Sequence, residues 1–223
     1  MRKTMKTTLS ALAMATLAGA FWFGAAALPD TGAARAQAAE TAAPAPAADP
    51  ARDIVMGNED APVTIIEYSS FTCPHCAAFS NDVFPEIKKE YIDTGKVKFI
   101  QREVYFNRYD LWAAMVARCG GDMRYYGFSK TYFAKQREWA GSDDPAVVAE
   151  NLRGIARAGG LNDEQVNACL NDQATAEALV KAYSERSQAD GINSTPTFII
   201  NGEKHSNMSL ADMKAVLDKA VAE

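Results

Sequence analysis

The order of apolar and polar residues predicts strands near both ends of the folded part and helices between them. Val63–Tyr68 is a short β-branched run, and residues 97–104 alternate apolar and polar side chains, as strands do. Between these runs, from Pro74 onward, apolar residues recur every three or four positions and indicate a helix with one buried stripe. Pro85 lies inside this pattern, so we expect a kink there or an end to the first part of the helix. Strand, helix and strand in this order predict a right-handed crossover in a parallel sheet.

From about residue 109 to residue 190 the pattern is helical, with recognisable helix ends. Asp144 and Pro145 suit the N-cap and the first position of one helix, and Asn162 precedes the start of another. Gly191 closes the last helix of this block, where a left-handed residue is favoured.

Strand character returns after the helical block. Residues 197–200 are an apolar run, Asn201-Gly202 predicts a tight hairpin turn, and residues 210–221 predict a terminal amphipathic helix. The helical block therefore interrupts an α/β domain. We predict an α/β domain made of residues 53–106 and 191–223, with a helical insertion over residues 107–190.

The first residues have the pattern of an export signal. Three basic side chains precede an uncharged apolar run from Leu9 to Leu28, and Ala36-Gln37-Ala38 offers a cleavage site. Because the run approaches the length of a membrane span, an uncleaved anchor is the alternative. We predict a signal peptide or N-terminal anchor over residues 1–38 and a flexible Ala/Pro-rich tether over residues 39–52.

Composition narrows the classes of function. Hydrophobic residues make up 48% of the 223 residues and charged residues 23%, which allows a packed soluble core. The formal net charge of −5 argues against an electrostatic nucleic-acid binder. Four cysteines are too few for a small disulfide scaffold, but they suffice for one active pair and one structural pair.

The motif Cys73-Pro74-His75-Cys76 lies directly after the first predicted strand and opens a predicted helix. With Pro74 at the first helical position, Cys73 takes the N-cap, where unpaired backbone N–H groups and the helix dipole favour a thiolate. The side chain of His75 can add a donor or a positive charge beside that sulfur. A stabilised thiolate makes the disulfide a stronger oxidant. The motif predicts a redox-active Cys73–Cys76 disulfide with no other cofactor.

Three other interpretations of the cysteine pair, a metal site, a haem attachment site and a purely structural disulfide, fit the residues less well. A zinc or copper site needs more ligands than this motif holds, and Cys119, Cys169 and His205 show no second paired spacing, so we predict no metal site. A c-type haem needs histidine directly after the second cysteine, where this chain has Ala77. A purely structural disulfide would close a ring too small to add much stability.

Residues 67–76, Glu-Tyr-Ser-Ser-Phe-Thr-Cys-Pro-His-Cys, resemble the active-site segment of the DsbA family of bacterial periplasmic disulfide oxidoreductases. The resemblance extends over about residues 53–222 and implies an α/β, thioredoxin-like fold with an inserted all-helical domain. It also implies that Cys73 forms mixed disulfides with substrates and that Cys76 is the buried partner.

Three further residues are assigned by the same resemblance. Thr195-Pro196 resembles the family's cis-proline loop, which faces the active pair and holds the substrate chain; an ordinary trans proline is the alternative. Glu67 matches the family's buried acid beneath the second cysteine, which implies proton transfer. Half-burial at a strand edge is the simpler alternative for Glu67.

The resemblance also implies a location and partners. It implies a periplasmic protein whose substrates are reduced exported proteins and which is reoxidised by a membrane quinone reductase of DsbB type. We expect a monomer. A disulfide isomerase or reductase is the first alternative, although isomerases of this kind usually carry a dimerisation module before the domain. A metal carrier using Cys73, His75 and Cys76 is the second alternative.

The chain departs from much of that family in having Cys119 and Cys169, both in the predicted helical block. If Cys73 and Cys76 form one pair, the second pair is Cys119–Cys169, as some α-proteobacterial members of the family look similar here. Such a bridge would close a loop of about fifty residues, worth roughly 4 kcal/mol in the chain-entropy model. Two unpaired buried thiols are the alternative.

Aromatic residues gather just before the helical block and in its first half. We favour a place in the core of that block over a binding groove. The cluster comprises Tyr105, Phe106, Tyr109, Trp112, Tyr125, Tyr126, Phe128, Tyr132, Phe133 and Trp139.

Overall fold

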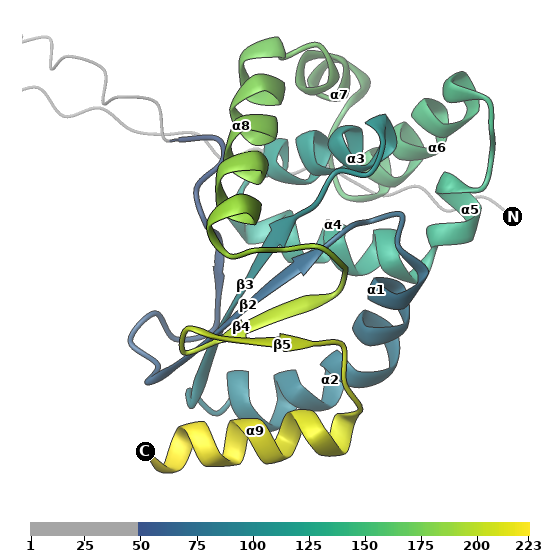
Figure 1. Cartoon of the computed structure of the whole chain (residues 1–223). Coiled ribbons are helices and arrows are strands. Elements are labelled where there is room, and N and C mark those ends of the chain that lie inside the picture. The colour runs from purple at the N-terminus through teal and green to yellow at the C-terminus, as the bar shows by residue number, and fades with distance from the viewer. Residues whose placement is uncertain (1–48) are drawn as a thin grey trace, which may run out of the picture. The chain divides into compact units, whose positions relative to one another are not determined.

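A five-stranded sheet forms the centre of the computed structural model, which describes residues 49–223 (Figure 1). The spatial order is β1-β3-β2-β4-β5, with β2 and β3 parallel and the other neighbours antiparallel. The parallel pair confirms the predicted crossover. The strands are β1 (Val55–Met56), β2 (Val63–Ser69), β3 (Val97–Glu103), β4 (Thr197–Ile200) and β5 (Glu203–Ser206).

The helix that joins β2 to β3 is continuous but irregular. It runs through α1 (Pro74–Ala78), a π-helical turn η1 (Phe79–Val83), α2 (Phe84–Ile87) and a second π-helical turn η2 (Lys88–Ile92). Pro85 lies inside α2 and does not end the helix. Because proline has no N–H to donate to the preceding turn, the expected irregularity takes the form of a wider π-helical turn just before it.

Six helices lie between β3 and β4, and two of their starts and the end of the last helix are at the residues that the sequence predicts. Asp144 and Asn162 cap helix starts with their side chains, and Gly191 follows the last helix with φ +60°. The helices are α3 (Arg108–Cys119), α4 (Asp122–Ala134), α5 (Gln136–Ala140), α6 (Pro145–Ala158), α7 (Asp163–Leu170) and α8 (Gln173–Ala189).

Two hydrophobic clusters fill the interior. One lies within the helical block and reaches Phe71, Cys73 and Cys76. The other lies between the sheet, the α1–α2 helix and the terminal helix α9 (Leu210–Ala222), with α2 and α9 below the sheet in the view of Figure 1. The first part of the α1–α2 helix also packs against α4 of the helical block. Of the ten residues of the predicted aromatic cluster, five are buried, and four more are partly buried and packed against the core, which supports the core interpretation, whereas Phe106 is exposed.

A buried ion pair joins the sheet to the helical block. The Arg118 Nη2 lies 2.7 Å from the Glu103 Oε2, and both side chains are more than nine-tenths buried. The Tyr125 hydroxyl donates to the same carboxylate at 2.7 Å, and Arg118 also donates to the carbonyls of Pro50 and Arg52. One cation therefore holds the end of β3, the helix α3 and the first described residues together.

The folded part begins earlier than predicted. The sequence predicts a flexible tether over residues 39–52, but Ala51 is buried against the helical block, and the carbonyls on either side of it accept from Arg118. The predicted signal peptide or anchor and the rest of the tether lie outside the described residues. Within residues 49–223, no helix has the length and hydropathy needed to cross a membrane.

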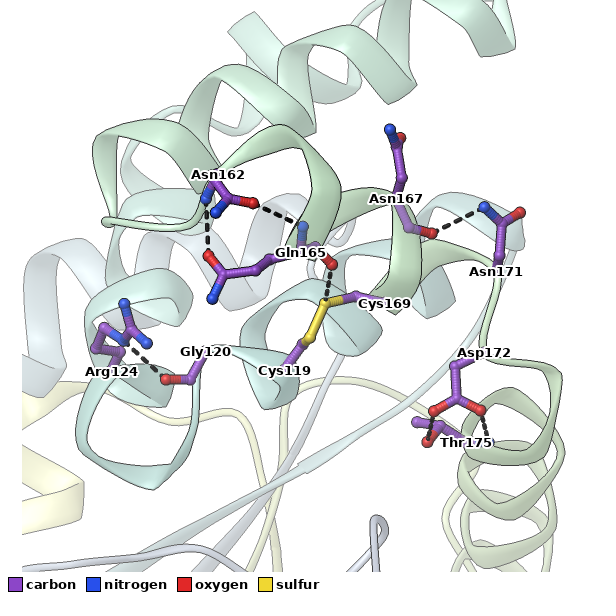
Figure 2. Close-up of a disulfide and its surroundings, with 10 residues drawn as sticks. All are labelled: Cys119, Gly120, Arg124, Asn162, Gln165, Asn167, Cys169, Asn171, Asp172 and Thr175. Carbon is purple, nitrogen blue, oxygen red and sulfur yellow. Dashed lines mark hydrogen bonds between the residues drawn. A yellow bond between two sulfur atoms is a disulfide. The ribbon is translucent and has the colours of Figure 1, made fainter.

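The second cysteine pair is joined. Cys119 ends α3 and Cys169 lies in α7, with 5.9 Å between their Cα atoms and a disulfide between their sulfurs (Figure 2). Figure 2 also shows the reciprocal bonds between Asn162 and Gln165 that begin α7. The bridge therefore fixes the end of α3, next to Arg118, to a helix that lies distant in sequence.

Candidate active site

Cys73 and Cys76 lie where β2 gives way to α1, as the sequence predicts. Cys73 is the N-cap of α1 with extended backbone angles, and Pro74 takes the first helical position. Both cysteines are free thiols in this structure. Cys73 is 8% exposed and Cys76 is fully buried, so only Cys73 keeps any exposure to solvent.

The surroundings of Cys73 favour its thiolate. Its pKa is lowered to about 5, chiefly because the Cys76 thiol donates to the Cys73 sulfur, while burial opposes this effect. Thr195 and the backbone N–H groups of Cys76 and His75 lower the pKa further. His75 contributes through its backbone N–H, and its imidazole, which the sequence suggests as a further donor or positive charge, is exposed.

Cys76 has the opposite character. Burial raises the pKa of its thiol far above the ordinary value, and the neighbouring groups Cys73 and Glu67 raise it further. The two sulfurs therefore differ strongly in acidity, although they share one turn of helix. In a dithiol of this kind, Cys73 is the nucleophile and the better leaving group, and Cys76 holds a proton.

The loop before β4 forms the opposite wall of the site. The Thr195-Pro196 peptide bond is cis, and the Cys73 Sγ lies 3.5 Å from the Thr195 carbonyl oxygen. The register explains this proximity, because Thr197 pairs with Tyr68 near the end of β2 that leads into the motif. Residues more than a hundred positions apart thus meet at one sulfur.

Glu67 lies in the interior beneath the active pair. It is 2% exposed on β2, a central strand flanked by β3 and β4, so half-burial at a strand edge is wrong. Burial raises the pKa of its carboxyl to about 8, as does the charge of Cys73, while the nearby Ser69 hydroxyl partly opposes the rise. A carboxyl with this pKa can hold or release a proton near neutral pH.

Asp110 holds the loop before Cys73, and sequence reasoning missed it. Its fully buried carboxylate accepts from the Ser70 hydroxyl at 2.8 Å and from the backbone and hydroxyl of Thr72 at 2.9 and 3.0 Å. It also accepts from the backbone N–H groups of Phe106 and Asn107. The signal available was the Asn107-x-x-Asp110 spacing, since the two residues form a capping box at the start of α3.

Gln136 holds the same loop through two of its backbone carbonyls. Its Nε2 donates to the carbonyl of Phe71 at 2.8 Å and to that of Cys73 at 3.0 Å. No sequence pattern points to this residue. Asp110 and Gln136 both belong to the helical block, so that block positions the backbone on which Cys73 lies.

Known proteins resemble this chain in sequence and in fold. A family profile described as thioredoxin matches residues 50–219. The crystal structure of alpha-DsbA1 from Wolbachia pipientis superposes with a TM-score of 0.71 at 32% identity, covering 77% of this chain and 92% of that one. Oxidised BdbD from Bacillus subtilis gives a TM-score of 0.69 at 26% identity, covering 77% of this chain and 94% of that one.

A curated relative from Rickettsia bellii, provisionally named a protein-disulfide oxidoreductase, is 36% identical over 172 residues. The match covers 77% of this chain and 65% of the relative. The chain thus spans less than two thirds of the length of this and the other Rickettsia relatives.

Proposed function

This chain belongs to the thioredoxin family and is of the DsbA type, and we propose that it is an oxidase that donates the Cys73–Cys76 disulfide to reduced exported proteins. The observation that carries this proposal is the difference in acidity between the two sulfurs, with the pKa of Cys73 lowered to about 5 and that of Cys76 raised. A stabilised thiolate favours the reduced enzyme, and therefore the transfer of the disulfide to a substrate.

The first step forms a mixed disulfide. A substrate thiolate attacks the sulfur of Cys73, the bond between Cys73 and Cys76 breaks, and its electron pair passes to the sulfur of Cys76. Because Cys76 is a strongly basic thiolate in its buried place, it takes up a proton. We propose that Glu67, neutral below about pH 8, supplies that proton.

The second step releases the product. A second thiolate of the substrate attacks the substrate sulfur in the mixed disulfide, and Cys73 leaves as a thiolate. The low pKa of Cys73 makes it a good leaving group. The substrate has lost two electrons and gained a disulfide, and the enzyme has become a dithiol. We propose reoxidation by a membrane quinone reductase of DsbB type.

The loop at Thr195-Pro196 is proposed to hold the substrate during both steps. It lies against the Cys73 sulfur, and an extended peptide placed there would pair with backbone groups. Contacts to backbone carry little sequence preference, which suits an enzyme with many substrates.

A periplasmic location is part of the same proposal. The Cys119–Cys169 disulfide supports it, because such a bridge persists in an oxidising compartment and is reduced in the cytosol.

Equilibration with glutathione tests the direction of electron flow. We expect a potential more oxidising than about −200 mV, because the Cys73 thiolate stabilises the dithiol form. The fraction of oxidised protein is measured by thiol trapping across a series of ratios of reduced to oxidised glutathione. A potential near −270 mV, as in thioredoxin, would reverse the proposed direction and favour a reductase.

Replacing Glu67 by glutamine is expected to stabilise the reduced protein against unfolding and to slow its transfer of disulfides. The folded-state pKa of about 8 exceeds the unfolded value of 4.5, so the contribution of Glu67 to the stability of the wild type falls as pH rises from 4.5 to 8. Glutamine does not titrate, so the gain of the variant grows over that range and then levels off. Turnover falls at least about tenfold, because Cys76 loses its proton donor.

Urea unfolding of the reduced proteins at pH 4, 6 and 8 measures the first effect, and oxidation of a reduced model protein measures the second. Stability curves of wild type and Glu67→Gln that run parallel from pH 4 to 8 would contradict the assigned protonation of Glu67.

A further inference from the structure

A cavity of about 440 Å³ lies beside the sheet, between β3, the α1–α2 helix and α4. Its size is within the range of small-molecule sites in proteins, about 300–1,000 Å³. The π-helical turn η1 contributes Ser80 and Asn81 to its wall. The remaining wall is largely apolar, formed by Met56, Phe84, Phe99, Tyr126 and Phe133.

Two polar side chains of neighbouring strands line this cavity without a full set of partners. Glu67 and Gln101 are opposite one another in the β2–β3 register, and each is 2% exposed. Among residues 49–223, the Glu67 Oε1 and the Gln101 Nε2 have no hydrogen-bond partner. The Ser129 hydroxyl donates to the Gln101 Oε1 at 2.6 Å. This bond fixes the orientation of the Gln101 amide and leaves its N–H groups without a hydrogen-bond acceptor. Buried polar atoms of this kind need a partner.

A hydroxyl group on an aromatic ring fits this arrangement. A hydroxyl donates to one group and accepts from another, so it can pair with Glu67 and Gln101 together. The ring would lie among aromatic walls, where the centroids of Phe84 and Phe99 are 4.6 Å apart. We propose that this cavity binds a phenol, with its hydroxyl between Glu67 and Gln101 and its ring against Phe84, Phe99 and Phe133.

The phenol has two sources, a free aromatic acid or a tyrosine side chain of a polypeptide. Lys88 and Lys130 line the cavity. Lys88 pairs with Asp93, whereas the exposed Lys130 has no carboxylate partner within residues 49–223. A free cation at this place favours a phenol that carries an acid.

Gly127 supplies a second, independent argument. It lies inside α4 and lines the cavity, and a Cβ added there would meet no atom within 4 Å. Glycine weakens a helix interior, and here neither backbone angle nor crowding requires it. A larger side chain at this position would occupy space that the cavity now leaves open.

The test is a titration of the full chain, followed by nuclear magnetic resonance, with 4-methylphenol and with toluene. We expect 4-methylphenol to bind at least about tenfold more tightly, because toluene leaves Glu67 and Gln101 unpaired. Gln101→Leu should remove this difference. Equal affinity of the wild type for the two compounds, or no binding of either, would overturn the proposal. The cavity would then be one that holds only water.

A matched pair of glycine variants distinguishes a loss of binding from a loss of folding. Gly127→Leu should abolish binding of 4-methylphenol while the melting temperature holds or rises. Gly154→Leu is the control, because Gly154 is an exposed glycine inside α6, also without neighbours within 4 Å, and does not line this cavity. It should bind as the wild type does. Unchanged binding by Gly127→Leu would place the ligand elsewhere and overturn the proposal.

Two further probes separate the sources. Tighter binding of 4-hydroxyphenylpropionate than of 4-methylphenol, lost in Lys130→Gln, supports a free acid. Tighter binding of an end-capped Gly-Tyr-Gly peptide supports a tyrosine side chain. These readouts do not involve the dithiol, so their outcome is independent of the proposed oxidase activity.

Discussion

Replacing Cys76 by alanine is expected to lower the rate of disulfide transfer about a thousandfold or more and to leave Cys73 able to form a stable mixed disulfide. Without Cys76 no internal disulfide can form, so the enzyme has no oxidising equivalent to donate. Cys73 keeps its place at the helix start and its backbone donors, including the N–H of His75. Nothing within the helix can then displace a substrate bound through Cys73.

Transfer is measured with a reduced model protein, and the mixed disulfide by mass spectrometry after exposure to oxidised glutathione. The matched variant is Cys73→Ala, which leaves only the buried Cys76. Because burial raises the pKa of Cys76, this variant should resist iodoacetamide at neutral pH while it stays folded. Alkylation of Cys73→Ala as fast as of Cys76→Ala would contradict the assigned roles of the two sulfurs.

Replacing Arg118 by alanine is expected to destabilise the protein by about 3–5 kcal/mol. The change leaves the carboxylate of Glu103 buried without its cation, and it frees the carbonyls of Pro50 and Arg52. The melting temperature should fall by on the order of 10 °C. Thermal unfolding followed by circular dichroism measures the effect.

A triple variant provides the control for this ion pair. Arg118→Met, Glu103→Leu and Tyr125→Phe together replace the pair and the hydroxyl that donates to it by apolar groups of similar volume. Since a well-packed apolar replacement of a buried ion pair is often neutral, the part of the lost stability that comes from the unpaired carboxylate should return, although the carbonyls of Pro50 and Arg52 still lack their donor. If the triple variant is less stable than Arg118→Ala, the loss does not come from an unpaired carboxylate.

Much of the fold could be predicted because its signals are local. Helix caps such as Asp144 and Asn162, the glycine after α8 and the Asn201-Gly202 turn each depend on neighbouring residues. β1 and β5 could not be predicted in the same way. β1 has two residues, and β5 is largely exposed and polar, so their pairing depends on the strands beside them.

The same distinction applies to the site. The position of Cys73 at a helix start follows from Pro74 and the preceding strand, and in the structure Cys73 is the N-cap of α1. The burial that separates the pKa of Cys76 from that of Cys73 depends on packing from distant segments. The two residues that hold the loop, Asp110 and Gln136, come from helices that no local pattern brings near the motif.

The hydrogen bonds from Asp110 and Gln136 bear on how separable the two parts of this protein are. Every residue of the segment from Ser70 to Cys73 bonds to Asp110 or Gln136 of the helical block. Moving Cys-Pro-His-Cys onto a bare thioredoxin scaffold would carry over the four residues but not their anchors. A descendant of this chain that lost the helical block would likewise keep its cysteines and lose the frame that aligns them. The insertion is therefore not a modular accessory, and redesign of this site has to treat both parts as one unit.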